Sequence, residues 1–275
     1  MKAYLALLRI ELKLTLRRRT VLFFHYLLPL VTFFALVELL DAEENGLTSS
    51  IVSMVTVLGI VANGFFGAGM RAVQEREANI LRRFKVAPIG PVPLLVASLA
   101  SGLILFLPAA AAVLAIARLR YGMPLPDHLG ALVVLMSVGV IAFRALGLVI
   151  AAVASSVQES QILVQLAYLP MVLLSGTTIP AAALPAWVHR LAAFLPSTYL
   201  LGGMQRIFLR GDGLLAIAAP LLALGITGAL GTFLAAQLFR WDKEEPIRPA
   251  AKLWVLAALA PCFALGLWQA VSGGR

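Results

Sequence analysis

The sequence predicts an all-α, polytopic membrane protein, and three features of composition and pattern predict it. Hydrophobic residues make up 61% of the 275 residues and charged residues 13%, with a mean hydropathy of +0.95. Uncharged apolar runs of about 20 residues or more recur along the chain, and such runs cross a bilayer as helices. Lysines and arginines gather between these runs, as at the ends of membrane spans. This composition leaves no room for a sizeable soluble domain.

Seven apolar runs are long enough to be membrane spans, and the segments between them set the orientation. With the N-terminus in the cytoplasm, the inner segments hold 15 lysines and arginines and the outer segments hold 6. The positive-inside rule therefore favours a cytoplasmic N-terminus. The predicted spans are residues 20–40, 47–70, 92–117, 129–154, 159–176, 213–239 and 253–272.

Residues 1–19, before the first span, predict an amphipathic helix in the cytoplasmic interface of the membrane. Four basic residues share one face at helical spacing, and leucines fill another face. Glu11 lies outside the basic face. We expect Glu11 to pair with Arg82, Arg83 or a partner protein, or to face solvent.

The charged stretch 71–93 separates the second and third predicted spans. Isolated charges at the bilayer centre cost about 2.5–3.5 kcal/mol each on insertion scales, so this segment lies outside the hydrocarbon. Its helical register and mixed charges favour a docking surface for a soluble partner over a loop that only sets topology. The charges that we expect to bind this partner are Glu75, Arg76, Glu77, Arg82, Arg83 and Lys85.

The uncharged run 160–188 is too long for one crossing, and prolines divide it. Because proline lacks the backbone donor and breaks helices, we expect the fifth span to end near Leu174. Short helices at about 182–195 and 198–210 would follow within the external segment 177–212 and dip back into the outer leaflet as a re-entrant hairpin. The alternative is an ordinary external loop.

Four stretches resemble the membrane subunits of ABC type-2 export permeases, and the resemblance covers about residues 1–240. The most specific stretch contains Leu169-Pro-Met-Val-Leu-Leu-Ser-Gly176, Ile179-Pro180, Leu184-Pro-Ala-Trp187 and Leu195-Pro-Ser-Thr-Tyr199. The others are the interfacial helix, the segment with Gln74–Glu77, Ile80–Arg83 and Val86–Pro88, and Phe143–Gly147. The resemblance implies a six-helix ABC type-2 exporter transmembrane domain over residues 1–240. Residues 241–275 would add a cytoplasmic linker and an extra seventh span.

The resemblance also implies a function. The chain would be the permease subunit of an ABC exporter that moves a hydrophobic or amphipathic substrate, such as a drug, an antibiotic or a lipid-like molecule, outward by alternating access. The chain contains no Gly-x4-Gly-Lys-Ser/Thr motif, so ATP and Mg²⁺ would be held by a separate ATPase subunit. A lipid-linked polysaccharide or another export cargo is one alternative, and an ATP-independent secondary transporter or channel is another.

The partners expected from the resemblance are two copies of a cytoplasmic ABC ATPase, a second copy of the permease and membrane lipids, with no nucleic acid. A homodimer is favoured over a heterodimer, in the bacterial cytoplasmic (inner) membrane. The three histidines lie at no metal-ligand spacing and no Gly-x-Ser-x-Gly motif occurs, so we expect neither an enzyme nor a bound metal or cofactor. The single cysteine, Cys262, excludes an intrachain disulfide.

In this family the substrate path lies between the two protomers and is lined mainly by spans two and five. Aromatic and methionine side chains there would suit an apolar cargo, although ordinary helix packing is the alternative for each residue taken singly. The residues that the resemblance places on the path are Asn63, Phe65, Phe66, Met70, Gln161, Gln165, Tyr168 and Met171.

Arg144 is the one charge deep within an uncharged run, at a position that is usually apolar in the family. An intramembrane charge is by default a functional-site hypothesis. We expect Arg144 to pair with Glu159, Gln158 or a carbonyl of span two, with a role in transport. The alternative is a side chain that snorkels to the inner interface or pairs helices.

Overall fold

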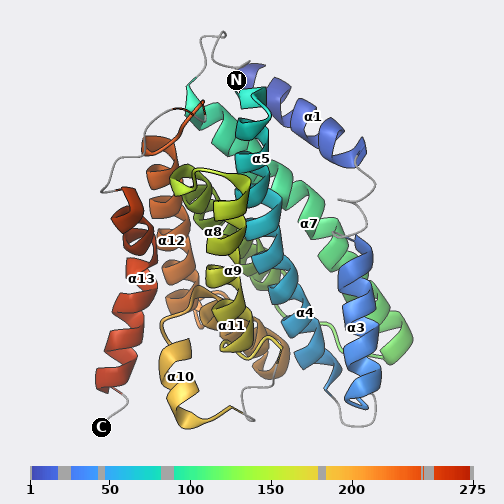
Figure 1. Cartoon of the computed structure of the whole chain (residues 1–275). Helices are drawn as coiled ribbons and strands as arrows, with labels where there is room; N and C mark the ends of the chain where they lie inside the picture. The colour runs from blue at the N-terminus through green and yellow to red at the C-terminus, as the bar shows by residue number, and fades with distance from the viewer. Residues whose placement is uncertain are drawn as a thin grey trace.

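The computed structural model describes residues 2–17, 26–42, 47–81, 90–178, 184–242, 244 and 251–272, and within them the regular elements are helices (Figure 1). The helices form a bundle with α1 at one end, where it packs against α7. In chain order they are α1 (Lys2–Arg17), α3 (Leu28–Leu39), α4 (Thr48–Ala62), the π-helix η2 (Asn63–Met70), α5 (Arg71–Glu77), α7 (Pro91–Tyr121), α8 (Leu129–Val153), α9 (Val157–Leu173), α10 (Ala186–Ala192), α11 (Pro196–Arg210), α12 (Ala218–Gln237) and α13 (Ala251–Ser272).

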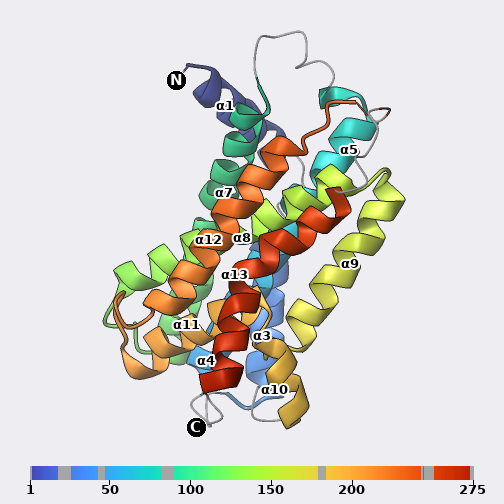
Figure 2. The same cartoon turned by 90° about the vertical axis from the view of Figure 1, so that its left-hand side faces the viewer.

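The two ends of the bundle carry different elements (Figures 1 and 2). We call the end with α1, α5 and the turn between α8 and α9 the α5 end. The opposite end, with α10, the α10–α11 joint and the last turns of α13, is the α10 end.

The prediction of an all-α, polytopic membrane protein is confirmed for the described residues. Four helical stretches have the length and composition of membrane spans: Thr48–Glu77, Pro91–Tyr121, Leu129–Val153 and Ala218–Gln237. The first and seventh predicted spans contain the shorter apolar helices Leu28–Leu39 and Ala257–Leu267, and the fifth corresponds to α9.

The predicted end of the fifth span agrees with the structure, whereas the first short helix after it, predicted at 182–195, covers only Ala186–Ala192. Helix α9 ends at Leu173, and Gly176 follows in the left-handed conformation with a φ of 86°. This backbone conformation favours glycine because a Cβ would be strained there. Helices α10 and α11 then occupy the segment where two short helices were predicted.

Helix α8 forms the centre of the bundle, and glycines let η2 approach it closely. A Cβ on Gly64 would lie 2.4 Å from the carbonyl carbon of Phe143, and a Cβ on Gly147 would lie 2.2 Å from the carbonyl oxygen of Gly64. Small residues permit this separation between membrane helices, where dispersion contacts replace the hydrophobic effect as the driving force. The wide π-helical turns of η2 therefore pack directly against the backbone of α8.

This contact predicts that Gly147→Ala destabilises the protein by about 1–3 kcal/mol, because the added methyl group forces two backbones apart. The matched control is Gly130→Ala in the same helix, where an added Cβ meets no atom within 4 Å. Thermal unfolding of the purified protein in detergent measures both changes. Equal unfolding temperatures for the two variants would contradict the close η2–α8 contact.

Candidate functional site

Helix α5 is a direct extension of the second span. Helices α4, η2 and α5 form one continuous helical run from Thr48 to Glu77. The run turns away after α5, where Asn79 adopts a left-handed conformation with a φ of 54°. Asparagine is among the few residues other than glycine that tolerate this conformation just after a helix. Because the helical run is continuous, a movement of α5 also moves the span that contains η2.

Two arginines bind the C-terminus of α8. Arg76 of α5 donates from Nη1 to the carbonyl oxygen of Ala151 at 2.8 Å and from Nη2 to that of Ala154 at 2.6 Å. Arg240, after α12, donates from Nε to the carbonyl oxygen of Ala152 at 3.0 Å and from Nη2 to that of Ala154. The last carbonyls of a helix lack partners within the helix and carry partial negative charge, so buried guanidinium groups stabilise them.

The next residue of α5 binds the N-terminus of α9. Glu77 accepts a hydrogen bond at its Oε1 from the backbone N–H of Val157, at 2.8 Å. Helix α9 also has its own cap, since Ser156 Oγ accepts from the Glu159 N–H at 3.1 Å and Glu159 Oε2 accepts from the Ser155 N–H at 2.7 Å. Carboxylates are stabilising at this end of a helix because its first N–H groups are unpaired and its dipole is positive there.

Helix α5 therefore holds two helix ends of opposite polarity with adjacent side chains. We name Arg76, Glu77 and the turn 151–157 the α5 clamp. It joins the continuous run that contains the second span to both α8 and α9.

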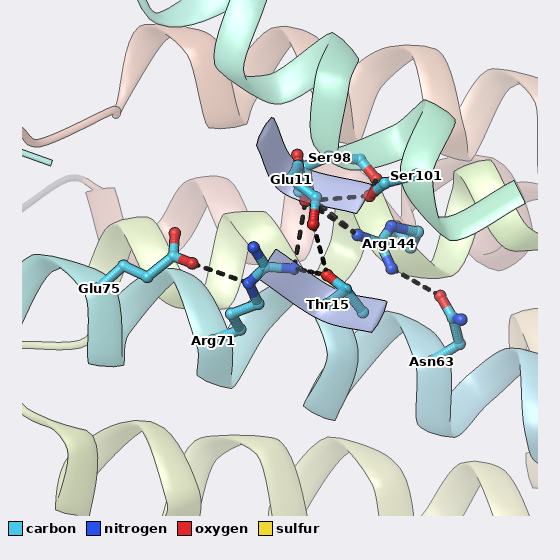
Figure 3. Close-up of polar contacts among 8 residues, drawn as sticks. All are labelled: Glu11, Thr15, Asn63, Arg71, Glu75, Ser98, Ser101 and Arg144. Atoms are coloured by element: carbon cyan, nitrogen blue, oxygen red, sulfur yellow. Dashed lines mark hydrogen bonds and ion pairs between the residues drawn. The ribbon is translucent and has the colours of Figure 1, made fainter. Parts of the chain in front are cut away.

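A cluster of charged and hydroxyl side chains lies beside the clamp and joins α1 to α5 (Figure 3). Arg71 donates from Nε to Oε1 of Glu75 at 2.8 Å and from Nη1 to Oγ1 of Thr15 at 2.8 Å. Its Nη1 also lies 3.5 Å from Oε1 of Glu11. The interfacial helix and α5 are thus linked by an ionic contact.

The same cluster continues into the bundle through Arg144, whose side chain is 3% exposed. Arg144 donates from Nη1 to Oδ1 of Asn63 at 2.8 Å and from Nη2 to Oγ of Ser98 at 2.9 Å. Its Nη2 lies 4.0 Å from Oε1 of Glu11, which also accepts from Ser101 Oγ at 2.9 Å. Figure 3 shows this chain of contacts from Glu11 to Asn63.

Asn63 also lines a groove of about 420 Å³, which is within the usual range of small-molecule sites. The groove is formed by uncharged side chains of α3, α4, η2, α7 and α9. Phe66 and Tyr168 form part of its wall, and their rings pack edge to face with centroids 5.2 Å apart. The arrangement suits an apolar molecule that carries few polar groups.

The family of this protein follows from comparison with known sequences. Residues 2–209, more than half of the chain, match the family described as "ABC-2 type transporter". The chain belongs to the ABC-2 type transporter family.

Two named relatives of this ABC-2 protein come from Escherichia coli (strain K12). The "Inner membrane transport permease YhhJ" is 25% identical over 205 residues, which cover 74% of this chain and 53% of the relative. The "Probable multidrug ABC transporter permease YbhR" is 25% identical over 165 residues, covering 60% of this chain and 44% of the relative. The chain thus spans about half the length of these curated relatives.

The structure of this ABC-2 protein brings together only part of the predicted substrate path. Asn63, Phe66 and Tyr168 line the groove. Phe65 is buried against Phe143 with ring centroids 6.2 Å apart, because neighbouring residues of a helix point in different directions. Met171 is buried as well, so neither Phe65 nor Met171 lines the groove.

The remaining predicted path residues lie around α9 and η2. Gln161 and Gln165 are exposed on α9, and Met70 is half-buried at the end of η2. None of these three side chains lines the groove described above.

The predicted docking charges also divide into groups. Arg76 was expected on a docking surface, but it is 3% exposed because the carbonyls of α8 bind it, so it joins helices within this ABC-2 protein. Glu75 and Glu77 are half-buried and contact Arg71 and Val157. Arg82, Arg83 and Lys85 lie outside the described residues.

The expected partners of Arg144 were wrong in part. The guanidinium group of Arg144 contacts Asn63, Ser98 and Glu11, and neither Gln158 nor Glu159 is among its partners. Its contact with the second span is made through the side chain of Asn63.

The expectation for Glu11 is also corrected. Its carboxyl group faces Arg71, Arg144 and Ser101 within the protein. Arg71 could have been found from its i, i+4 spacing to Glu75. Arg240 gave no local signal, because the carbonyls that it binds lie 86 and 88 residues earlier in the chain.

The clamp predicts that Arg76→Ala destabilises the protein by about 2–3 kcal/mol, because hydrogen bonds from a charged donor to buried carbonyls are lost. The control is Gln74→Ala, which truncates an exposed side chain of the same short helix. Thermal unfolding in detergent measures both variants. If Arg76→Ala unfolds at the same temperature as Gln74→Ala, Arg76 does not hold the end of α8.

A second prediction concerns the pH dependence of stability. Burial raises the pKa of Glu11 above its ordinary value of 4.5, while Arg71, Arg144 and the Ser101 hydroxyl act in the opposite direction. The stability contributed by Glu11 is therefore complete below pH 4.5 and is lost as the pH rises through its raised pKa. Glu11→Gln removes this titration.

The unfolding temperature of Glu11→Gln minus that of the wild type should therefore increase from pH 4.5 upwards, by about 2–4 °C for each kcal/mol. The control is Glu38→Gln, which changes an exposed carboxyl of α3 outside the cluster. A difference between Glu11→Gln and the wild type that is constant or falls with pH would contradict the assignment.

Proposed function

We propose that this chain is the membrane subunit of an ABC exporter in the bacterial cytoplasmic membrane, with its N-terminus in the cytoplasm. The observation that carries the proposal is the α5 clamp, through which one short polar helix holds spans two, four and five together. A soluble ATPase that moves α5 would act on all three spans at once.

The surface of α1 supports placing the α5 end at the cytoplasmic side. Arg9, Lys13 and Arg17 are exposed, and so are apolar residues such as Leu5 and Leu16. A helix with both kinds of exposed side chain is stable in the plane of the membrane interface, with basic groups against anionic headgroups. The excess of basic residues in the predicted inner segments favours the same orientation.

The motion follows from the connections of α5. Because α5 continues into η2 and α4, its displacement turns the second span. Glu77 transmits the same displacement to the first turn of α9. The groove beside Phe66 and Tyr168 lies between these two elements, so the motion changes its shape. Packed interfaces have discrete alternative arrangements, and alternation between two of them would give inward-open and outward-open states.

The neutral groove supports a hydrophobic or amphipathic cargo such as a drug, an antibiotic or a lipid-like molecule. Its aromatic walls supply apolar area, and Asn63 supplies a polar group. The word "multidrug" in the name of YbhR agrees with such a cargo for that relative. ATP and Mg²⁺ would bind to the partner ATPase.

The exposed face of α9 supports assembly with a second copy of the chain. Ile162, Leu166 and Leu169 are exposed beside Gln161 and Gln165. Within a bilayer, paired amide side chains between two copies would be worth about 1 kcal/mol per contact. A homodimer through α9, with one ATPase bound to each copy, would bring the grooves of the two copies close to the interface between them, where a common substrate path could run. The six spans would be α3, the run α4–η2, α7, α8, α9 and α12, and α13 would be the seventh.

The proposal predicts that the tagged chain, cross-linked in its native membrane, is recovered with an ABC ATPase. In the reconstituted pair, Glu77→Ala should retain ATP hydrolysis but lose most of its stimulation by a lipophilic substrate, because α5 no longer holds the first turn of α9. The control is Gln74→Ala. Recovery of no ABC ATPase, together with flux driven by a proton or sodium gradient alone, would overturn the proposal in favour of a secondary transporter.

A further inference from the structure

Helix α13 lies beyond residues 2–209, which match the family, and it packs beside α12 towards the α10 end (Figure 2). Its contacts reach the α10–α11 joint, residues 193–195. We propose that α13 is a brace. It holds this joint, and through it the last turn of α9, packed against the bundle at the α10 end. The inference goes beyond the proposed function and does not depend on an ATPase or on a particular cargo.

The first anchor of the brace is a close contact between α13 and the joint. A Cβ on Gly266 would lie 2.7 Å from the carbonyl oxygen of Ala193 and 2.8 Å from Cδ1 of Phe194. One turn earlier on α13, the Phe263 ring packs on the Phe194 ring with centroids 5.3 Å apart. Glycine at 266 lets the helix backbone reach the joint, and the aromatic pair adds attraction beyond that of buried area.

The second anchor seats α13 on α12. Ala258 and Cys262 are 0% exposed, and Cys262 Sγ lies 3.5 Å from the Thr227 hydroxyl. Cys262 is also packed with Ala223 and Tyr199. Ala258 and Cys262 lie on one face of α13 at helical spacing, so α13 is also held at these two positions before Gly266.

The joint is in turn bonded to α9. The Tyr199 hydroxyl of α11 donates to the carbonyl oxygen of Ala193 at 2.7 Å. Ser197 Oγ, in the first turn of α11, donates to the carbonyl oxygen of Met171 near the end of α9 at 2.7 Å. A continuous set of contacts therefore runs from α13 through the joint to the outer end of α9.

This arrangement gives α9 two attachments of different kinds. Its first turn is held by the α5 clamp, and its last turn is held by α11 and the braced joint. While the Ser197–Met171 hydrogen bond is intact, outward displacement of the last turn of α9 must separate the joint from Phe263 and Gly266 or carry α13 with it. The brace therefore raises the free energy of opening at the α10 end.

The test uses the fact that Cys262 is the only cysteine of the chain. In a Cys262→Ser background, which replaces the thiol beside Thr227 with a hydroxyl that can keep the hydrogen bond, Val172→Cys places a thiol at a buried position near the end of α9. The purified full chain in nanodiscs is reacted with a water-soluble maleimide. The labelling rate reports how often this end of α9 opens to water.

The variants remove the first anchor in two ways. Gly266→Val forces α13 away from the joint, and its control is Gly225→Val, where an added Cβ meets no atom within 4 Å. Phe263→Ala removes the aromatic pair, and its control is Leu267→Ala, an exposed side chain of the same helix. The second pair keeps the test decisive if Gly266→Val does not fold.

We expect Gly266→Val and Phe263→Ala each to raise the labelling rate of Val172→Cys by roughly two- to twelvefold over the controls, as an aromatic pair of about 0.5–1.5 kcal/mol implies. Rates that match the controls in both variants would overturn the proposal. They would show that α11 alone holds the end of α9 and that α13 does not restrain it.

Discussion

The packing of this helix bundle depends on how the last backbone carbonyls of α8 are bound. A helix that stops inside a packed bundle leaves up to four carbonyls without partners, and each would be costly away from water. Here two guanidinium groups from distant parts of the chain, Arg76 and Arg240, bind the carbonyls of Ala151, Ala152 and Ala154. The negative end of α8 stabilises these two buried cations, and they stabilise it. The ends of α5, α8 and α12 are therefore bound at one place, and α9 begins immediately after it.

This constraint explains why α5 is suited to transmit force. A surface ion pair is worth about 0–1 kcal/mol and would yield under load. Buried hydrogen bonds from a charged donor are individually stronger, and Arg76 and Glu77 act on two helix ends at adjacent positions. The separate cluster of Glu11, Arg71 and Arg144 then fixes the interfacial helix to the same region. Motion of α5 without α9 would break the Glu77 bond to the first turn of α9, and motion away from α8 would expose unpaired carbonyls.

Much of the fold could be predicted from the sequence, because its determinants are local. Apolar runs of sufficient length specify spans, and Pro185 and Pro196 begin the two short helices that follow α9. The site could be predicted only in part. Arg76 and Glu77 were identified as important charges, but not as buried ones, since Arg76 binds carbonyls 75 and 78 residues away. Arg144 was identified from its isolation in an apolar run, yet its partners Glu11 and Asn63 come from two other helices. Periodicity does not report which helix faces meet.

The most direct measurement of the central claim is a pair of distances in the assembled transporter. Spin labels at Gln74→Cys and Gln158→Cys, both exposed in the wild type, are introduced in a Cys262→Ser background. With both labels, electron paramagnetic resonance measures the α5–α9 distance within one copy. With Gln158→Cys alone, it measures the α9–α9 distance between the two copies. Each distance is measured without nucleotide and with trapped ATP. The account predicts that the first distance stays constant while the second changes. A change of several Å in the first distance on ATP binding would contradict it, because α5 would then move without α9.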